Sequence, residues 1–229
     1  MRTEHHIRQP TLLDYAAGQL PAALSLVAAS HLAWCRDCRR AADAAARAPE
    51  GPQVPGGPAP APAPGQTAVQ AMDRRPAADE MSTGDTRDTR DMGDMGDMGD
   101  FGLPMPLALC LDGCGLEDVA WRKVLPGVAV RELELPPGAA GQLRLVRMAP
   151  GKALPEHGHG SGELTLVLRG AYSDGLGRFT IGDIADLDGA AVHRPVADDA
   201  GPCICLVATA TPARYRSWLT RLWQRVTGI

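Results

Sequence analysis

Apolar residues recur with helical spacing in the first part of the chain, where they predict three short helices. Thr11 and Asp14 resemble a capping box at the start of the first helix. Pro21 suits the first turn of a second helix, which is expected over about residues 22–34. A third, alanine-rich helix is expected to begin near Asp37. The apolar positions of the second helix are Leu24, Val27, Ala28 and Leu32.

The pattern changes after about residue 116 to short apolar segments separated by Gly and Pro, which is typical of an all-β barrel or sandwich. The segments expected as strands are residues 128–135, 142–148, 163–168, 184–187, 191–195 and 203–209. A final helix is expected from about Pro212, with an apolar stripe that includes Trp218 and Leu222. We expect this stripe to pack on the barrel, and a partner-facing or membrane-facing helix is the alternative.

The middle of the chain, residues 49–102, predicts a disordered linker rather than a folded unit. It alternates Pro, Ala and Gly, and an Asp-Met-Gly repeat begins at Asp91. Residues 67–75 could form one short helix that orders against a partner. The domains expected are therefore residues 1–48, a linker over 49–102, and residues 103–229.

Composition and charge exclude several classes of protein. The 229 residues carry a net charge of −4, and residues 51–100 hold nine Asp and Glu against four Arg, so the acidity belongs to the linker. Because neither end of the chain is strongly basic, direct nucleic-acid binding is disfavoured. No apolar run is long enough for a membrane span and no signal peptide is evident, which predicts a cytoplasmic protein with reduced thiols.

Six His and six Cys fall into clusters, of which the first is His31, Cys35 and Cys38. On a helix, positions i, i+4 and i+7 lie on one face, so the three side chains can converge. A structural zinc ion takes four tetrahedral nitrogen and sulfur ligands, and either His5 or His6 could supply the fourth. Zinc would also staple a helical unit too small for a large core.

The H-x3-C-x2-C spacing at residues 31–38 resembles the zinc-binding anti-sigma domain of bacterial anti-sigma factors. The resemblance implies that His31, Cys35 and Cys38 bind zinc and that His6, rather than His5, is the fourth ligand. It also implies that the domain sequesters a sigma factor of the extracytoplasmic-function (ECF) class. In that family a further helix grips the sigma factor, and residues 67–75 are the only candidate for it here.

A second cluster consists of His157, His159, Glu163 and His193. On a strand, residues i and i+2 point to one face, so His157 and His159 can bind one ion together, and Glu163 shares their parity. His193 must come from another strand. Three imidazoles and a carboxylate suit zinc or another divalent transition metal.

This second cluster looks like a cupin metal site. Gly151, His157-Gly158-His159, Glu163 and Gly170 reproduce the spacing of the first cupin motif, and Gly182 and His193 match the second motif in part. The two halves together resemble the ChrR family of anti-sigma factors, which join these two domains. The implied fold is multidomain α + β: a small N-terminal zinc-bound helical bundle, a disordered linker, and a C-terminal cupin-like β-barrel or jelly roll.

The remaining cysteines form two pairs. Cys203 and Cys205 share one face of a strand, either as small core residues or as a redox pair, although a disulfide between them would be strained. Cys110 and Cys114 lie where the linker meets the second domain, and no role is assigned to them.

The resemblance implies a cytoplasmic anti-sigma factor rather than an enzyme. Its zinc domain would hold an ECF sigma factor, and its cupin-like domain would release that factor on sensing an oxidant such as singlet oxygen or an organic peroxide. The alternatives are a cupin metalloenzyme, a dioxygenase or isomerase, with an appended zinc domain, and a binding module without a sigma partner. The sequence leaves the oligomeric state open.

Overall fold

The computed structural model describes residues 3–47, 102–158 and 162–211. The expected helix over residues 67–75 and the expected helix from Pro212 lie outside these described residues, as does nearly all of the expected linker. None of the helices described has the length and apolar character that a membrane crossing requires.

The helices come from both sides of the linker. They are α1 (Gln9–Ala16), α2 (Ala22–Trp34), α3 (Arg36–Arg47) and α5 (Met105–Cys110). The expected second helix is confirmed at both ends. The expected capping box is wrong, because α1 begins before Thr11, its N-cap residue is Arg8, and no side chain caps it. Pro10, in the first turn, has a fixed φ that favours this earlier start.

Helix α5 was not predicted from the sequence. It has six residues, MPLALC, which is too short for helical periodicity to be visible. Two prolines at its start read as a continuation of the linker. The helix nevertheless packs against α2, and its Leu107 side chain is completely buried.

The β-strands follow one another closely from residue 122 to residue 209. They are β1 (Arg122–Leu125), β2 (Val128–Leu133), β3 (Gln142–Met148), β4 (His157–Gly158), β5 (Glu163–Arg169), β6 (Ala171–Asp174), β7 (Gly177–Thr180), β8 (Ile184–Leu187), β9 (Val192–His193), β10 (Val196–Ala197) and β11 (Cys203–Thr209). The expected strands 142–148, 184–187 and 203–209 are confirmed at both ends. The short strands β1, β6, β7 and β10 were missed because two to four residues do not establish an alternating pattern.

The strands form antiparallel sheets that stack as a sandwich. A six-stranded sheet has the order β1-β2-β3-β11-β5-β8, a three-stranded sheet has the order β10-β6-β7, and β4 pairs with β9. Tyr172 and Phe179 of the small sheet pack against Val146 and Val167 of the large one. Of the two architectures expected, the described strands therefore form the sandwich.

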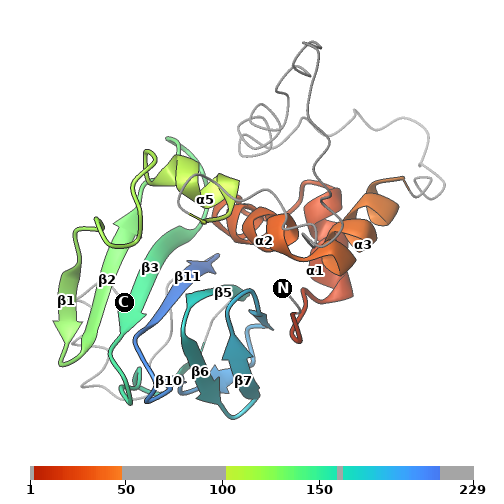
Figure 1. Ribbon diagram of the computed structural model, residues 1–229. Coiled ribbons are helices and arrows are strands. Elements are labelled where there is room, and N and C mark those ends of the chain that lie inside the picture. The colour runs from red at the N-terminus through yellow and green to blue at the C-terminus, as the bar shows by residue number, and fades with distance from the viewer. Residues whose placement is uncertain (1–2, 48–101, 159–161, 212–229) are drawn as a thin grey trace, which may run out of the picture.

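The large sheet is buried on both faces, as β11 shows. Cys203 and Cys205 point into the core between the two sheets. Ile204 and Leu206 point the opposite way, into a second core that they share with Val27 of α2. The helices thus form a third layer on the outer face of the large sheet (Figure 1). Burial on both faces explains why these strands are almost continuously apolar.

The helical layer meets the sheet closely enough to require a glycine. The backbone N–H of Ala23 donates to the carbonyl of Ala140 at 3.2 Å. At Gly141, whose φ is 99°, an added Cβ would lie 2.7 Å from the Cβ of Ala23 and 3.0 Å from a backbone oxygen. The two metal-binding domains expected from the sequence are therefore in direct contact, although a long linker joins them.

We predict that Gly141→Ala destabilises the protein by about 3 kcal/mol or more. The substitution adds strain from a positive φ, and its methyl group also pushes α2 away from the sheet. Urea unfolding followed by circular dichroism measures this loss.

Gly138→Ala is the matched control, because Gly138 has a φ of 82° but nothing within 4 Å of an added Cβ. It should cost only the backbone strain, about 1–2 kcal/mol. Equal losses in the two variants would contradict the close docking of α2 on the sheet.

Candidate metal centres

The structure brings four side chains together at the junction of α2 and α3. Their potential ligand atoms all lie within 4.8 Å of one another, and the residues are His6, His31, Cys35 and Cys38. His31 Nε2 is 3.3 Å from Cys38 Sγ, and His6 Nδ1 is 3.3 Å from Cys35 Sγ and 3.5 Å from Cys38 Sγ.

His31, Cys35 and Cys38 were expected to converge on one face of a single helix, but a junction between two helices brings them together instead. His31 lies in the last turn of α2, and α2 ends at Cys35, whose φ and ψ of −100° and 105° are those of extended backbone. α3 begins at the next residue, so Cys38 lies in its first turn. The segment before α1 brings His6 to the same place.

Neighbouring groups orient these ligands. His31 Nδ1 donates to the carbonyl of Gly182 at 3.0 Å, which places the proton on Nδ1 and directs the Nε2 lone pair at the sulfur atoms. Thr3 Oγ1 donates to Cys35 Sγ at 3.3 Å. The hydrogen bond between the two sulfur atoms lowers the pKa of Cys35, although burial opposes this shift, and it raises the pKa of Cys38, so the pair favours one thiolate, the form that binds metals.

The donor set fits zinc. Two ligands of a tetrahedral zinc ion, one nitrogen and one sulfur, lie about 3.5 Å apart when the bonds have their usual lengths. The nitrogen–sulfur distances here are 3.3–3.5 Å. His6, His31, Cys35 and Cys38 would hold such an ion as a structural staple between α2, α3 and the N-terminal segment.

A second set lies inside the sandwich and consists of His157, Glu163 and His193, whose potential ligand atoms also lie within 4.8 Å of one another. His157 and His193 are direct partners across the β4–β9 pair, with ring centroids 4.6 Å apart. His193 Nε2 is 3.7 Å from Glu163 Oε1. All three side chains are buried.

Contacts around this set also fix the imidazoles. His157 Nδ1 donates to the carbonyl of Pro155 at 2.8 Å, and His193 Nδ1 lies 3.0 Å from Asp174 Oδ2. Both rings therefore direct the Nε2 lone pair inward, as in a carboxylate–histidine–metal arrangement. Burial and the nearby His193 lower the pKa of His157 to about 4, so this ring is neutral at pH 7.

The pKa values of the two carboxylates near this set, Glu163 and Asp174, are shifted in opposite directions. Burial raises the pKa of Glu163, which a bound cation would reverse. Burial also acts to raise the pKa of Asp174, but hydrogen bonds from His193 and from backbone N–H groups outweigh it and lower the pKa. The set fits a divalent transition metal that accepts nitrogen and oxygen ligands.

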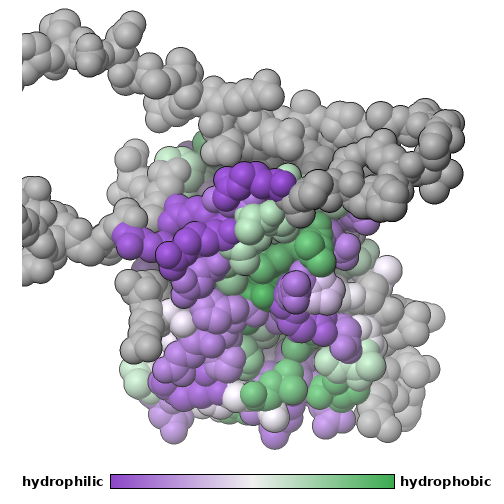
Figure 2. All heavy atoms as spheres, turned by 90° about the vertical axis from the view of Figure 1, so that its right-hand side faces the viewer, coloured by the Kyte–Doolittle hydropathy of each residue, from purple (hydrophilic) through white to green (hydrophobic). Residues whose placement is uncertain are grey.

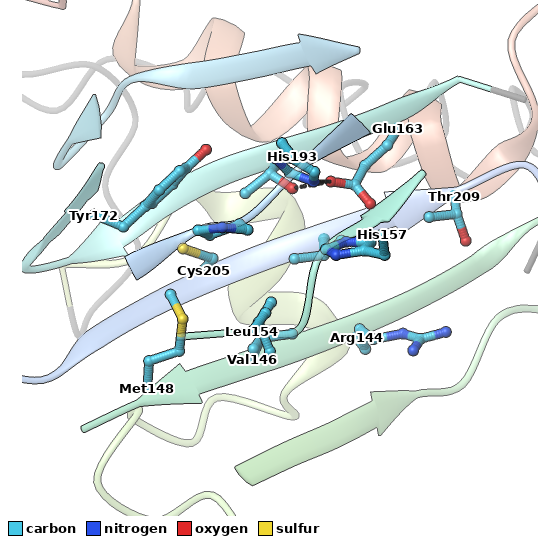
Figure 3. Close-up of a pocket in the computed structure, with 13 residues that line it drawn as sticks. Arg144, Val146, Met148, Leu154, His157, Glu163, Tyr172, His193, Cys205 and Thr209 are labelled. Atoms are coloured by element: carbon cyan, nitrogen blue, oxygen red, sulfur yellow. Dashed lines mark hydrogen bonds and ion pairs between the residues drawn. The ribbon is translucent and has the colours of Figure 1, made fainter. Parts of the chain in front are cut away.

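A cavity adjoins the second set (Figure 3). Its volume is about 50 Å³, measured as the space open to the centre of a water molecule. Strands β3, β5 and β11 supply most of its floor, and β4, β6 and β9 close the other side. It is lined by Arg144, Val146, Met148, Leu154, His157, Glu163, Thr165, Tyr172, His193, Pro195, Cys205, Val207 and Thr209.

The N-terminal segment, residues 3–8, connects the two sets. The backbone N–H groups of Glu4 and His5 donate to Asp183 Oδ1 at 2.7 and 3.1 Å. Arg8 forms an ion pair of 3.1 Å with Asp186 of β8. The His5 ring packs on Phe179 with centroids 4.2 Å apart, and Phe179 stacks on Tyr172, which lines the cavity.

Among the residues proposed as ligands from the sequence, the structure brings seven into two sets, while His159 lies outside the described residues. The ring of His5 is elsewhere, on Phe179. Cys203 and Cys205 are buried thiols with sulfur atoms 3.6 Å apart.

Cys110 ends α5 and is half-buried, and Cys114 is exposed. Neither belongs to a ligand set in the part of the chain that the structure describes.

Several residues at the two sets were missed from the sequence. Asp174 precedes a glycine and reads as an ordinary turn residue. Gly182 was matched to the second cupin motif, but the contact of its carbonyl with His31 was not predicted, because no side-chain pattern reveals a backbone acceptor. Tyr172 and Arg144 lie on strands far from the histidine motif, and only the fold brings them to the cavity.

Comparisons with known proteins agree with this architecture. A family model described as the ChrR Cupin-like domain matches residues 112–212. The anti-sigma-E factor ChrR of Cereibacter sphaeroides is 39% identical over 224 residues, which is 98% of either chain. A chain in the crystal structure of Rhodobacter sphaeroides SigE in complex with the anti-sigma ChrR matches with a TM-score of 0.63 and 35% identity, covering 91% of this chain and 100% of that chain.

The β-sandwich is thus a cupin-like domain, and a helical region precedes it. The chain belongs to the ChrR family of anti-sigma factors. Its family is one of regulators rather than enzymes, and the resemblance seen in the two histidine motifs is confirmed.

We predict that His6→Ala weakens zinc binding by about 100-fold or more, because it removes one of four converging ligands. Competition with a chromophoric chelator measures the affinity. His5→Ala is the control, because its ring contacts Phe179 rather than the sulfur atoms, and it should change the affinity by less than about threefold. A larger effect of His5→Ala than of His6→Ala would contradict the ligand assignment.

Proposed function

We propose that this protein sequesters an ECF sigma factor through its N-terminal helical region, residues 1–48, and releases it when the cupin-like domain, residues 103–229, senses an oxidant. Residues 49–102 would link the two, and the protein would act in the cytoplasm, where sigma factors meet RNA polymerase. The observation that best supports this proposal is the 39% sequence identity to an anti-sigma-E factor along 98% of the chain.

Sigma binding is supported by the relative seen with SigE, which this chain matches over 91% of its length. The helical surface offers suitable chemistry. Figure 2 shows the side of the molecule on which apolar side chains form a band flanked by hydrophilic ones. Leu13 of α1 is 49% exposed, so a partner that covers α1 would bury it.

Zinc at His6, His31, Cys35 and Cys38 would be structural in this proposal. It would hold the N-terminal segment, α2 and α3 in the arrangement that the partner recognises. Binding of a structural zinc ion supplies on the order of 10 kcal/mol to a small fold, so its loss would disorder this region.

Oxidant sensing is proposed for the second set and its cavity. A buried ion held by His157, Glu163 and His193, together with His159, would be reachable by a small molecule through the cavity. Cys203 and Cys205 are a second candidate, in which two thiols lose two protons and two electrons to a peroxide that becomes an alcohol and water. The hydrogen bond with Cys203 and burial raise the pKa of Cys205 far above its usual value, so a thiolate is scarce and the metal site is favoured as the primary sensor.

The contact between the domains supports a route from sensor to sigma-binding region. Gly182 holds His31 of the first set, and Asp183 holds the N-terminal segment that carries His6. Strand β8, which follows directly, pairs with β5 at Glu163. A change at the second set can therefore shift the population of docked N-terminal segment.

We predict that a Cys35→Ala/Cys38→Ala variant loses capture of an ECF sigma factor, because it lacks two of the four zinc ligands. Co-purification with metal content measured on the same sample tests this. His157→Ala is the control and should capture the sigma factor as the unaltered chain does. Failure of the intact, zinc-loaded chain to capture any such sigma factor would refute the proposal.

We predict that His157→Ala and Glu163→Ala keep sigma capture but abolish release, because the sensing site is lost. A reporter gene driven by the sigma factor, treated with singlet oxygen or an organic peroxide, measures release. Unchanged induction in both variants would remove the second set from the mechanism.

Asp183→Ala extends this test to the contact between domains. It alters none of the ligand residues, and it removes the acceptor of two N-terminal N–H groups and of the N–H and hydroxyl groups of Thr180. Asp188→Ala is its control, because Asp188 is exposed and its carboxylate accepts only near the surface, from Arg8 and from the backbone N–H of Ala190. Induction should fall in Asp183→Ala and stay unaltered in Asp188→Ala.

The alternative of a cupin metalloenzyme is less favoured, because the chain resembles a regulator over nearly its whole length. Bound iron with substrate-dependent oxygen uptake would favour the enzyme, whereas zinc without turnover would favour the sensor.

A further inference from the structure

The cavity contains two buried hydroxyl groups whose hydrogen bonds are unmade. Among the described residues, Tyr172 Oη and Thr209 Oγ1 have no hydrogen-bond partner. The two residues are only 1% and 4% exposed, and both line the cavity. Buried hydroxyl groups almost always find a partner, so a molecule inside the cavity, water or a ligand, would complete the hydrogen bonds of these two.

The two hydroxyl groups lie at opposite ends of the cavity, with the second ligand set between them (Figure 3). Thr209 is at the end of β11, where it pairs with Glu163 of β5. Tyr172 is on β6 of the small sheet, and its stacking on Phe179, with centroids 4.9 Å apart, fixes its ring. A molecule that contacts both hydroxyl groups must therefore pass the metal position.

The polar end of the cavity favours an oxygen anion. The Arg144 residue is 6% exposed, and its charge acts on both His157 and Glu163. It donates to Gln142 Oε1 at 2.8 Å and forms an ion pair of 3.8 Å with Glu132, whose side chain is half-exposed. Two carboxylates lie near the cavity, and each has another contact. Glu163 belongs to the ligand set, and Asp174 accepts from His193.

The opposite end offers a neutral donor. Burial raises the pKa of Tyr172 well above its ordinary value, so its hydroxyl keeps its proton and donates to an oxygen atom. Between the ends the wall is apolar, and its side chains are Val146, Met148, Leu154, Pro195 and Val207. The volume of about 50 Å³ corresponds to about four water molecules and so to a small organic molecule.

We propose that this cavity binds a short carboxylic acid of about three to five carbons that carries a second oxygen at its far end. Its carboxylate lies at the metal position near Thr209 and Arg144, its hydrocarbon part lies along the apolar wall, and its far hydroxyl or carbonyl oxygen accepts from Tyr172. The proposal rests on the metal-binding role proposed for His157, Glu163 and His193, and it names the class of small molecule that this site takes.

Calorimetric titration of the zinc-loaded full chain with 4-hydroxybutanoate, butanoate and butan-1-ol tests the proposal. We expect one site that binds 4-hydroxybutanoate about tenfold more tightly than butanoate, and no binding of butan-1-ol. Tyr172→Phe should abolish the preference for 4-hydroxybutanoate and leave butanoate unaltered. Thr209→Val should weaken both acids.

A stability measurement separates ligand contacts from a structural role. Because Tyr172→Phe and Thr209→Val each remove an unpaired buried hydroxyl, the melting temperature of the ligand-free protein should rise in both. Ser25→Ala is the matched control, since its buried hydroxyl already donates to the carbonyl of Leu20 outside the cavity. It should lower the melting temperature and leave acid binding unaltered.

The proposal is overturned if neither acid binds saturably, or if both cavity variants bind the acids as the unaltered chain does. Capture of the sigma factor is measured on the same samples. This measurement distinguishes failure of the proposed acid binding from failure of the proposed anti-sigma function. Capture without acid binding refutes the ligand alone, and acid binding without capture refutes only the anti-sigma role.

Discussion

The burial of both faces of the six-stranded sheet is the constraint on which the structure depends. One face of β11 and β5 packs on the small sheet, and the other packs on α2 and α5. A sandwich with the helices removed would expose Leu145, Leu166 and Leu206 to water. Each fully buried leucine stabilises a fold by about 1.5–3 kcal/mol. Burial of these leucines therefore strongly stabilises the docked arrangement of the helices on the sheet.

This packing also places the two ligand sets in one framework. The first set lies where the N-terminal segment meets α2 and α3, and the second lies between the sheets. The turn that contains Gly182 and Asp183 supports His31 and the N-terminal segment, and it leads into β8, which pairs with β5 at Glu163. Two sites that seem independent in the sequence therefore share a short stretch of backbone.

Predictions from the sequence were confirmed where they depended only on the residues of a single helix or strand. The 13 residues of α2 are mostly apolar, follow a proline that suits the first turn and are buried on all sides over 23–32, and β11 has the length and β-branched character of a buried strand. The spacing of His31, Cys35 and Cys38 needed only one helix junction. By contrast, α5 is too short to show a period, and the start of α1 depended on a proline rather than on Thr11.

Long-range contacts were beyond the sequence patterns. Asp174 reaches His193 from a neighbouring hairpin, and Gly182 reaches His31 across 151 positions. Nor did the sequence indicate contact between the helices and the sheet. Its long Pro- and Gly-rich middle suggested separate units. The helices dock on the sheet nevertheless, because docking buries the apolar side chains on the outer face of β5 and β11.

The hydrogen bond from His31 to the Gly182 carbonyl has a thermodynamic consequence. Because this bond orients His31 only while the domains are docked, docking would strengthen the binding of a metal ion at the first set. Linkage makes the effect reciprocal, so a metal ion bound there would strengthen docking by the same factor. Loss of a metal ion from the first set would therefore also weaken the docking of the helices on the sandwich. Metal release and separation of the two domains would then occur together, as one cooperative event.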